Sequence, residues 1–316
     1  GWGAQNYSHL GNLMKILLTG CDGQVGWEVC RQAKALNLEV VPTDIANLDI
    51  TNIDAVRAIQ SKEKADIFIN SAAYTAVDKA ESDQPLAYAV NATGAKNLAI
   101  VASETNAPIL HISTDYIFSG NSSVPYQEGD EPDPTGVYGE TKLAGERQVE
   151  AANDKFVTLR TSWVFGIEGQ NFVKTMLRLA RERDELTVVA DQFGSPTFAG
   201  HIAAALLALT KQYEAEGVLP WGNYNFCDSG PTTWHGFANN IMKVGVESGV
   251  LDKSPIVRPL RSEDYPTLAA RPGYSVMDCS LFLKTFPEIG ISSWEAGLRE
   301  MIGSARVKAE ILGSKS

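Results

Sequence analysis

Cysteine is scarce in this chain of 316 residues, which contains only four. They are Cys21, Cys30, Cys227 and Cys279, and they form neither a CxxC pair nor the spacing of metal ligands. The sequence therefore predicts reduced thiols in a cytoplasmic protein, with no disulfide framework and no structural metal.

The sequence also has no long apolar run. Its opening residues, GWGAQNYSHLGN, have neither the positive n-region nor the apolar h-region of an export signal. No stretch has the length and apolarity of a membrane span. We therefore expect no membrane partner, and we interpret residues 1–13 as a native extension or an expression remnant.

Positively charged residues are fewer than negatively charged ones. The chain has 27 Lys and Arg against 38 Asp and Glu, which gives a net charge of -11. This excess of negative charge disfavours binding to nucleic acid or to an anionic membrane. An anionic substrate must then meet local Arg, Lys or backbone N–H groups. The length and the hydrophobic content of 44% are those of an ordinary globular protein with one large or two closely joined domains.

Short apolar segments alternate with helical ones along the first half of the chain. The expected strands are MKILLTG, LEVVPTD, ADIFINSAA, APILHISTDYIF and KFVTLRTSWVFG. Such alternation predicts an α/β fold with a Rossmann-like, doubly wound parallel sheet. We expect a dinucleotide-binding domain over 14–166, with later elements near 187–228 returning to it. Residues 167–316 would mainly form a smaller C-terminal α/β substrate domain, with loops in its Pro-rich stretch.

A glycine-rich turn follows the first expected strand, with Gly20, Gly23 and Gly26 in GCDGQVG. A purely structural turn is the alternative, but a strand before the motif and a helix after it are the context that a dinucleotide site requires. Gly20 would allow the tight turn, Gly23 the approach of a pyrophosphate, and Gly26 the packing of helix on strand. The helix N-terminus would then face the phosphates.

An acidic residue, Asp44, ends the second expected strand. A carboxylate there can accept hydrogen bonds from both ribose hydroxyls and would repel a 2′-phosphate, whereas an ordinary turn residue is the alternative. The cofactor is therefore predicted to be NADH or NADPH, with NADH favoured. In LDIT, Asp49 and Ile50 could flank the adenine.

Tyr138 and Lys142 are four residues apart in VYGETKLAGE, so on a helix they would share a face. The alternative is an exposed helix with a solvated lysine. A cation close to a phenol favours phenolate and would lower its pKa, which makes Tyr138 a candidate acid.

Taken in order, the glycine motif, NSAA, STDY and YxxxK resemble the extended short-chain dehydrogenase/reductase family over roughly residues 14–302. Further stretches, among them AAYTAVDKAES, RTSWVFG and DQFGSPT, resemble the members that act on a dTDP-linked sugar. The implied reaction is the NAD(P)H-dependent reduction of the C4 keto group of a dTDP-4-keto-6-deoxysugar, the last step towards dTDP-L-rhamnose.

The resemblance also implies roles for single residues. Thr114 would hydrogen-bond the substrate carbonyl, Tyr138 would protonate it, and Lys142 would bind the nicotinamide ribose and depress the pKa of Tyr138. Asn91 would support a strand, and an Asn on the surface of a helix is an equally good interpretation. The remaining implied contacts are Gln24, Val25, Ala72 and Ala73 for the cofactor, and Val77, Asp115, Tyr116 and Trp163 for the substrate.

The substrate's diphosphate requires a cation, and three arginines in the Pro-rich stretch are candidates: Arg258, Arg261 and Arg271. Arg271 is preferred, because Pro272 and Gly273 fix a loop beside it and the resembled enzymes share its RP pattern. Arginine suits a bidentate phosphate contact.

Some members of the resembled group dimerise through a Mg²⁺ ion held by carboxylates. Glu28 could match one ligand, but Gly200 and His201 stand where an acid would be expected. The sequence therefore predicts no metal, and leaves a monomer or a homodimer of another kind open.

Three rival functions can be weighed from the sequence. Dehydratases of the family carry Asp-Glu after the threonine, whereas Asp115 and Tyr116 stand here, which argues against dehydration. An epimerase is less clearly excluded. The third possibility is a non-catalytic regulatory subunit, which an intact set of Thr114, Tyr138 and Lys142 disfavours without excluding it.

Overall fold

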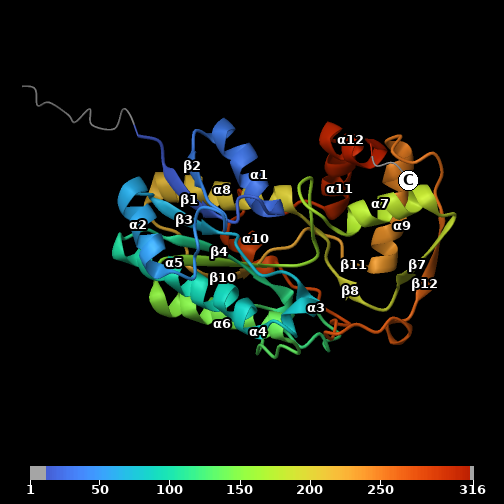
Figure 1. The fold of residues 1–316 in the computed structure, drawn as a ribbon, viewed down its shortest axis with the longest axis horizontal. Helices are drawn as coiled ribbons and strands as arrows, with labels where there is room; N and C mark the ends of the chain where they lie inside the picture. Colours follow the sequence, from blue (N-terminus) through green and yellow to red (C-terminus); the bar gives the residue numbers. More distant parts are fainter. Residues whose placement is uncertain (1–11, 314–316) are drawn as a thin grey trace, which may run out of the picture.

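The fold is that of a computed structural model, which describes residues 12–313 (Figure 1). Most of the expected extension, residues 1–11, lies outside this range, and the first strand begins at Lys15. None of the described helices is both long enough and apolar enough to cross a membrane.

A parallel sheet of six strands occupies one half of the molecule, in the order β10-β5-β4-β3-β1-β2. All of its neighbouring strands run parallel. In this spatial order the strands are Gly222–Asn225, Phe156–Thr161, Ile109–Thr114, Ile67–Asn70, Lys15–Thr19 and Glu39–Pro42. The predicted doubly wound α/β sheet is confirmed.

Helices cover both faces of this sheet, as Figure 1 shows. One face carries α1 (Gln24–Ala33) and α8 (Ala199–Glu216), and the other carries α2 (Ile53–Glu63), α5 (Ala95–Glu104) and α6 (Val137–Ala152).

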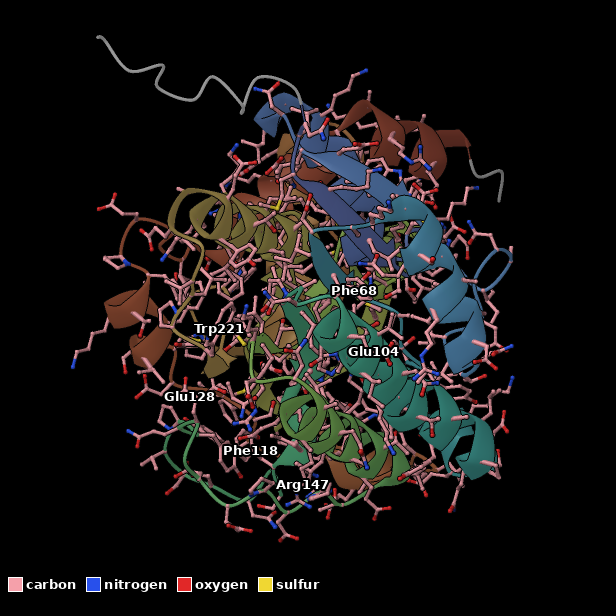
Figure 2. The ribbon with its side chains drawn as sticks, turned by 90° about the vertical axis from the view of Figure 1, so that its left-hand side faces the viewer. Phe68, Glu104, Phe118, Glu128, Arg147 and Trp221 are labelled. Carbon is pink, nitrogen blue, oxygen red and sulfur yellow. The ribbon has the colours of Figure 1, made fainter. Side chains whose placement is uncertain are left out.

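The strands contribute side chains to the apolar cores on both faces of the sheet, because successive side chains point to opposite faces. In β1, Ile16 and Leu18 join the core under α1 and α8, whereas Leu17 joins the core under α2 and α5. Phe68 of β3, labelled in Figure 2, is fully buried in the second of these cores. The near-continuous apolar strands of the sequence are therefore buried on both sides.

A continuous helical run with a π-helical centre follows the loop after β3. After the short helix α3 (Val77–Ala80), α4 (Gln84–Tyr88) leads directly into the π-helical stretch (Ala89–Gly94) and then into α5. A Cβ on Gly94 would lie 2.5 Å from Cδ1 of Ile50, so a larger residue here would have to displace that side chain.

The other half of the molecule is built around a second apolar core, from helices and short strands. Its helices are α7 (Phe172–Glu182), α9 (Trp234–Glu247), α11 (Trp294–Gly303) and α12 (Ala305–Gly313). Three two-stranded sheets accompany them: β6 (Val164–Phe165) with β9 (Thr197–Phe198), β7 (Glu185–Val189) with β12 (Ile256–Leu260), and β8 (Phe193–Gly194) with β11 (Thr232–Thr233). The short helix α10 (Ser280–Thr285) packs against β10 through Phe282 and Tyr224.

Two expectations about this half need correction. The segment LTVVAD was expected to return to the main sheet, but β7 pairs with β12 instead, and only α8 and β10 return. The Pro-rich stretch was expected to be loops, yet β12 lies within it, because Pro259 occupies an edge position in a two-stranded ladder.

Candidate functional site

A cavity of about 820 Å³ opens at the carboxyl ends of the central strands. It is lined by the turns that follow β1, β3, β4 and β5, together with the start of α6 and the first residue of α9. The chain order reverses between β1 and β3, and this switch point is where open α/β sheets bind ligands.

The glycine turn leaves room for a ligand to come close to the protein backbone at one end of the cavity. Gly20 has φ +70°, and a Cβ on it would lie 2.7 Å from the carbonyl carbon of Ser71. Gly26 packs α1 onto the turn so closely that a Cβ would lie 2.0 Å from the Gly20 carbonyl oxygen. Gly23 is the N-cap of α1 and has no side chain to cap it. These glycines form a cradle that fits a pyrophosphate at a helix N-terminus.

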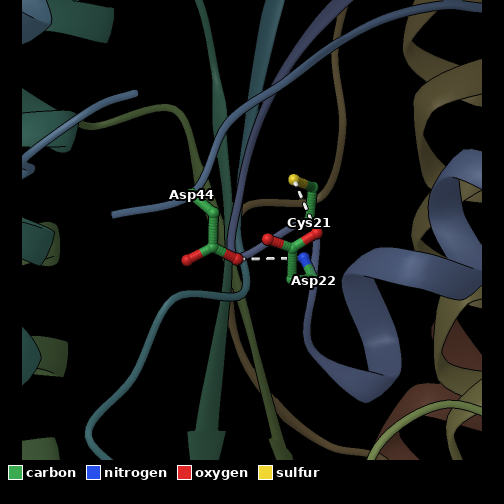
Figure 3. Close-up of side chains that lie close together, drawn as sticks. All are labelled: Cys21, Asp22 and Asp44. Carbon is green, nitrogen blue, oxygen red and sulfur yellow. Dashed lines mark hydrogen bonds between the residues drawn. The ribbon is translucent and has the colours of Figure 1, made fainter. Parts of the chain in front are cut away.

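Two carboxylates stand at the β2 end of this cradle, as Figure 3 shows. Asp44 lines the cavity, and its side chain accepts hydrogen bonds from the backbone N–H groups of Asp22 (2.9 Å) and Ile45 (2.7 Å). Cys21 lies beside them, with its Sγ 3.8 Å from Asp22 Oδ1. Burial and the neighbouring carboxylates raise the pKa of Cys21 to about 11, so that it stays a neutral thiol. A neutral thiol is a poor metal ligand.

Three consecutive residues at the end of β4 form the centre of the cavity. Thr114 Oγ1 donates to Asp115 Oδ1 (3.1 Å) and accepts from the Tyr116 N–H (3.2 Å). Asp115 is buried, and burial raises the pKa of its carboxyl to about 6 even though hydrogen bonds from Ser275 and Thr114 oppose the shift. Among the described residues, its Oδ2 has no hydrogen-bond partner.

Tyr138 enters the cavity from the first turn of α6. The Val137 N–H at this helix terminus donates to Glu81 Oε1 (3.0 Å), which fixes the start of the helix. The Tyr138 ring meets Tyr116 edge-on, with 5.3 Å between centroids and 76° between planes. Tyr138 and Thr114 both line the cavity, so the phenol and the hydroxyl face the same space.

The expected effect of Lys142 on Tyr138 needs correction. Burial raises the pKa of Tyr138 to about 12, against a smaller lowering by the hydrogen bond with Thr114. Lys142 is not among the groups that shift it, because its ammonium is turned to the strand. The prediction of a depressed phenol pKa was therefore wrong for the protein without ligands.

Lys142 is buried rather than solvated. Its Nζ donates to the carbonyl of Ile112 (2.7 Å), and burial lowers its pKa to about 8 while the charge of Glu146 raises it. Glu146 lies one turn further along α6, where it is paired with buried Arg160 at 2.8 Å and also accepts from Ser113. The alternative of an exposed helix with a solvated lysine is thereby excluded.

Asn91 is also buried, which excludes a surface role. Its side chain accepts from the Tyr74 N–H (2.8 Å) and donates to the Tyr74 carbonyl (3.1 Å) and to Thr141 (3.1 Å). The π-helical stretch around it thus ties the loop after β3 to the helix that carries Tyr138. This geometry agrees with a supporting role.

Arg271 is the arginine predicted to contact the substrate's diphosphate. It does not line the cavity, but lies near Tyr116 and pairs with Asp78 at 2.8 Å. Asp78 also accepts from the Ala269 N–H (2.9 Å), so this carboxylate fastens the loop of Arg271 onto α3. The other two candidates, Arg258 and Arg261, are exposed and pair with Glu185 and Asp264.

The residues considered for a metal contact other side chains of this protein. Buried Glu28 accepts from Arg31 (2.7 Å) and from Gln32 (2.9 Å) through Oε2. His201 contacts Asp228 through Nδ1 at 2.8 Å. The other carboxylate oxygens, Glu28 Oε1 and Asp228 Oδ1, have no hydrogen-bond partner among the described residues. In the part of the chain that the structure describes, neither carboxylate belongs to a group of three or more potential metal ligands.

Most predicted site residues come together in this one cavity. Its lining includes all the predicted cofactor residues except Gly26, and all the predicted substrate residues except Arg271. Sequence reasoning missed Ser162, Gln170 and Trp234, which also line it. Trp234 lies 92 residues after Lys142, the nearest predicted cofactor residue, so no local pattern indicates it.

Comparison with known proteins gives matches over most of the described chain. The family model described as the RmlD substrate binding domain matches residues 14–307. The chain belongs to the RmlD family. Curated RmlD relatives include the dTDP-4-dehydrorhamnose reductase of Aggregatibacter actinomycetemcomitans, 42% identical over 92% of this chain and 98% of the relative. The enzyme of that name from Salmonella typhimurium is 39% identical over 92% of this chain and 97% of the relative.

Solved structures of RmlD proteins agree with this assignment. A dTDP-4-dehydrorhamnose reductase from Bacillus anthracis, in complex with NADP, has a TM-score of 0.85 and 35% identity, covering 92% of this chain and 99% of that one. The Clostridium acetobutylicum protein of that name has a TM-score of 0.84 and 41% identity, covering 92% of this chain and 98% of that one. A UDP-glucose 4-epimerase from Thermotoga maritima (TM-score 0.72, 19% identity, 92% of this chain and 97% of that one) shares the fold alone.

Proposed function

We propose that this protein reduces the C4 keto group of dTDP-4-dehydrorhamnose to give dTDP-L-rhamnose, with NADH or NADPH as reductant. The observation that carries the proposal is the convergence of Thr114, Tyr138 and Lys142 on one cavity that also contains the glycine cradle. Relatives about 40% identical over most of the chain bear the name of this activity.

The chain's own residues supply the cofactor's binding site. Gly20 and Gly23 would leave space for the pyrophosphate, and Asp44, which lines the cavity, would accept from the adenosine ribose. Lys142, held at the carbonyl of Ile112, would bind the nicotinamide ribose. When bound, the reduced nicotinamide supplies the hydride. The protein's remaining task is to orient the keto sugar and to deliver one proton to its oxygen.

Tyr138 is the proposed proton donor. Because its pKa is raised to about 12, the phenol is fully protonated at neutral pH and holds the proton that the reduction consumes. Thr114 donates a second hydrogen bond to the same carbonyl oxygen, exchanging Asp115 for the substrate as acceptor. Two donors placed where negative charge develops stabilise the transition state.

Lys142 carries the compensating positive charge. In the reduced-cofactor complex its ammonium would bind the ribose and favour transient phenolate on Tyr138 once the proton has left. Its lowered pKa of about 8 makes this charge dependent on pH within the physiological range.

For the cofactor, we propose a preference for NADH. Asp44 lines the cavity and the exposed carboxylate of Asp22 lies next to it, joined through the Asp22 N–H. A 2′-phosphate would meet these two negative charges, whereas ribose hydroxyls can donate to them. A solved relative was crystallised with NADP, so the preference proposed here rests on this chain's own residues.

The experiment that tests the function uses purified protein, NADH and dTDP-4-dehydrorhamnose. Oxidation of NADH with formation of dTDP-L-rhamnose is the expected result. Interconversion of dTDP-sugars without net NADH consumption would favour the epimerase alternative, and no turnover would favour a regulatory subunit. Dehydration is disfavoured because Tyr116 packs against Tyr138 where a dehydratase carries its second acid.

We also propose a cytoplasmic location, supported by four free cysteines, and a monomer or a homodimer that does not depend on Mg²⁺. Gly200 and His201, which stand where an acidic ligand would be expected, support the second point.

A further inference from the structure

Trp163 adopts an unusual backbone conformation at the wall of the cavity. It lies two residues after the end of β5 and has φ +46°, a left-handed value that a bulky residue rarely adopts. Its carbonyl accepts from the Thr197 N–H (3.1 Å), which holds the backbone in place. Such strain persists only where surrounding structure enforces it, and it gathers at functional sites.

The Trp163 indole contacts two segments that are distant in sequence. Trp234 stacks on it with 3.7 Å between ring centroids and 11° between planes. Gly194 approaches it so closely that a Cβ would lie 2.4 Å from Cε2 of Trp163. Gly194 pairs with Thr232 in the β8–β11 ladder, and Trp234 follows that ladder directly as the first residue of α9, so both contacts come from one small sheet and the helix after it.

Trp234 is itself fixed. It is the first residue of α9, whose N-cap Thr233 accepts from the Gly236 N–H (3.0 Å). Its ring also contacts Phe172 at 4.8 Å between centroids. Trp163 is therefore held by an anchored partner rather than by a mobile side chain.

We propose that Trp234 is a positioning residue for the substrate's sugar ring: it holds the Trp163 indole as a fixed wall beside the C4 carbonyl. The inference rests on the proposed function. Both indoles line the cavity that contains Thr114 and Tyr138.

The sugar, rather than the nucleotide, is the part of the substrate that this wall would meet. Thr161, the last residue of β5, is in register with Thr114 on β4, and Trp163 follows only two residues later. The wall thus stands at the reacting end of the cavity. An aromatic surface suits the C–H bonds of a pyranose ring and the apolar methyl group of a 6-deoxysugar.

The test measures Trp234→Ala and Trp234→Phe against wild type. For each protein, kcat and KM for dTDP-4-dehydrorhamnose are determined, with Kd for dTDP-L-rhamnose, for dTDP and for NADH. Trp221→Ala is the matched control, since Trp221 (labelled in Figure 2) packs near Tyr213, outside the cavity lining.

Loss of the stack should lower kcat and weaken dTDP-L-rhamnose binding by about tenfold each, the size of an aromatic pair. Binding of dTDP and of NADH should stay within about twofold, and Trp234→Phe should recover most of the loss. The near-UV circular dichroism of the stacked indoles should change on adding dTDP-L-rhamnose and should be lost in Trp234→Ala.

An independent variant tests the same wall through Gly194, the other residue that contacts the Trp163 indole. Gly194→Ala should displace the indole and reproduce the same split between sugar and nucleotide binding, since a Cβ has no room there. The inference is overturned if Trp234→Ala keeps wild-type kcat and sugar affinity, or if dTDP, NADH and sugar affinities all fall together. Absence of turnover in the wild type would instead overturn the proposed function.

Discussion

At the scale of single residues, Tyr138 is a phenol whose proton is firmly held and whose hydroxyl lies beside Thr114. Tyr138→Phe removes that proton and leaves the ring in contact with Tyr116. We expect turnover to fall by on the order of 10²-fold or more, with Kd for NADH nearly unchanged. Steady-state kinetics at saturating substrate, with NADH titration by fluorescence, measure both quantities.

Tyr88→Phe is the control for this variant, because Tyr88 is an exposed tyrosine of α4. It should retain wild-type kinetics. Near-normal turnover of Tyr138→Phe would show that another group protonates the sugar oxygen.

The second prediction at the scale of single residues concerns Asp44. Asp44→Asn removes the negative charge but keeps an oxygen that can accept from the Asp22 and Ile45 N–H groups. The ratio of kcat/KM for NADPH to that for NADH should rise by about tenfold, because a 2′-phosphate meets one carboxylate fewer. Asp44→Ala, which also loses the two backbone contacts, should weaken both cofactors in addition. An unchanged ratio would show that Asp44 does not face the ribose.

At the scale of one element, α6 carries Tyr138, Lys142 and Glu146 at intervals of four residues, so that all three lie along one face. Burial lowers the pKa of Lys142 to about 8, and the charge of Glu146 opposes this shift. If charged Lys142 is the active form, kcat/KM should decline as pH rises through about 8, the point where the ammonium loses its proton.

Glu146→Gln tests that assignment. Without the carboxylate, the pKa of Lys142 should fall further, so the declining limb of the pH profile should move to lower pH. Glu150→Gln, at an exposed position one turn later, is the matched control and should leave the limb in place. A limb that does not move in Glu146→Gln would assign it to a different group.

The π-helical stretch before α5 gives a second prediction at this scale. Asn91→Ala leaves the partly buried N–H and carbonyl of Tyr74 without their side-chain partner. We expect the free energy of unfolding to fall by about 2 kcal/mol, the cost of unsatisfied buried polar groups. Urea unfolding measures it, and Asn239→Ala on an exposed face of α9 should change stability by less than about 0.5 kcal/mol.

At the scale of the whole molecule, the ion pair of Arg271 with Asp78 joins the C-terminal loops to α3 next to the cavity. Arg271 remains our candidate for the substrate's diphosphate, because it is the cation placed near Tyr116 and its partner is itself only half buried. Arg271→Ala should raise KM for the nucleotide sugar by about tenfold or more and leave Kd for NADH unchanged.

Arg258→Ala is the matched control, since Arg258 is exposed and pairs with Glu185 on the other strand of its small sheet. It should behave as wild type. If Arg271→Ala weakens NADH binding instead, the ion pair with Asp78 supports the fold of the site rather than the diphosphate.

Much of the site could be predicted because its signals are local. The glycine turn, Asp44 and the Tyr138–Lys142 pair each lie within, or directly after, a single strand or helix, where spacing alone fixes which side chains share a face. The parallel sheet was predictable for the same reason, since its strands are continuous apolar runs separated by helical segments.

The remaining features depend on contacts between segments that are distant in sequence. The pairing of β7 with β12, the ion pair of Arg271 with Asp78 and the stack of Trp163 on Trp234 have no local signal. The pKa values of Tyr138 and Lys142 likewise follow from burial, which spacing does not reveal. Sequence by itself determined the chemistry that the chain carries, because local geometry follows from residue order. Only the tertiary structure decided which distant side chains surround the site and how strongly the pKa values of its residues are shifted. The reason is that desolvation and packing depend on the assembled core.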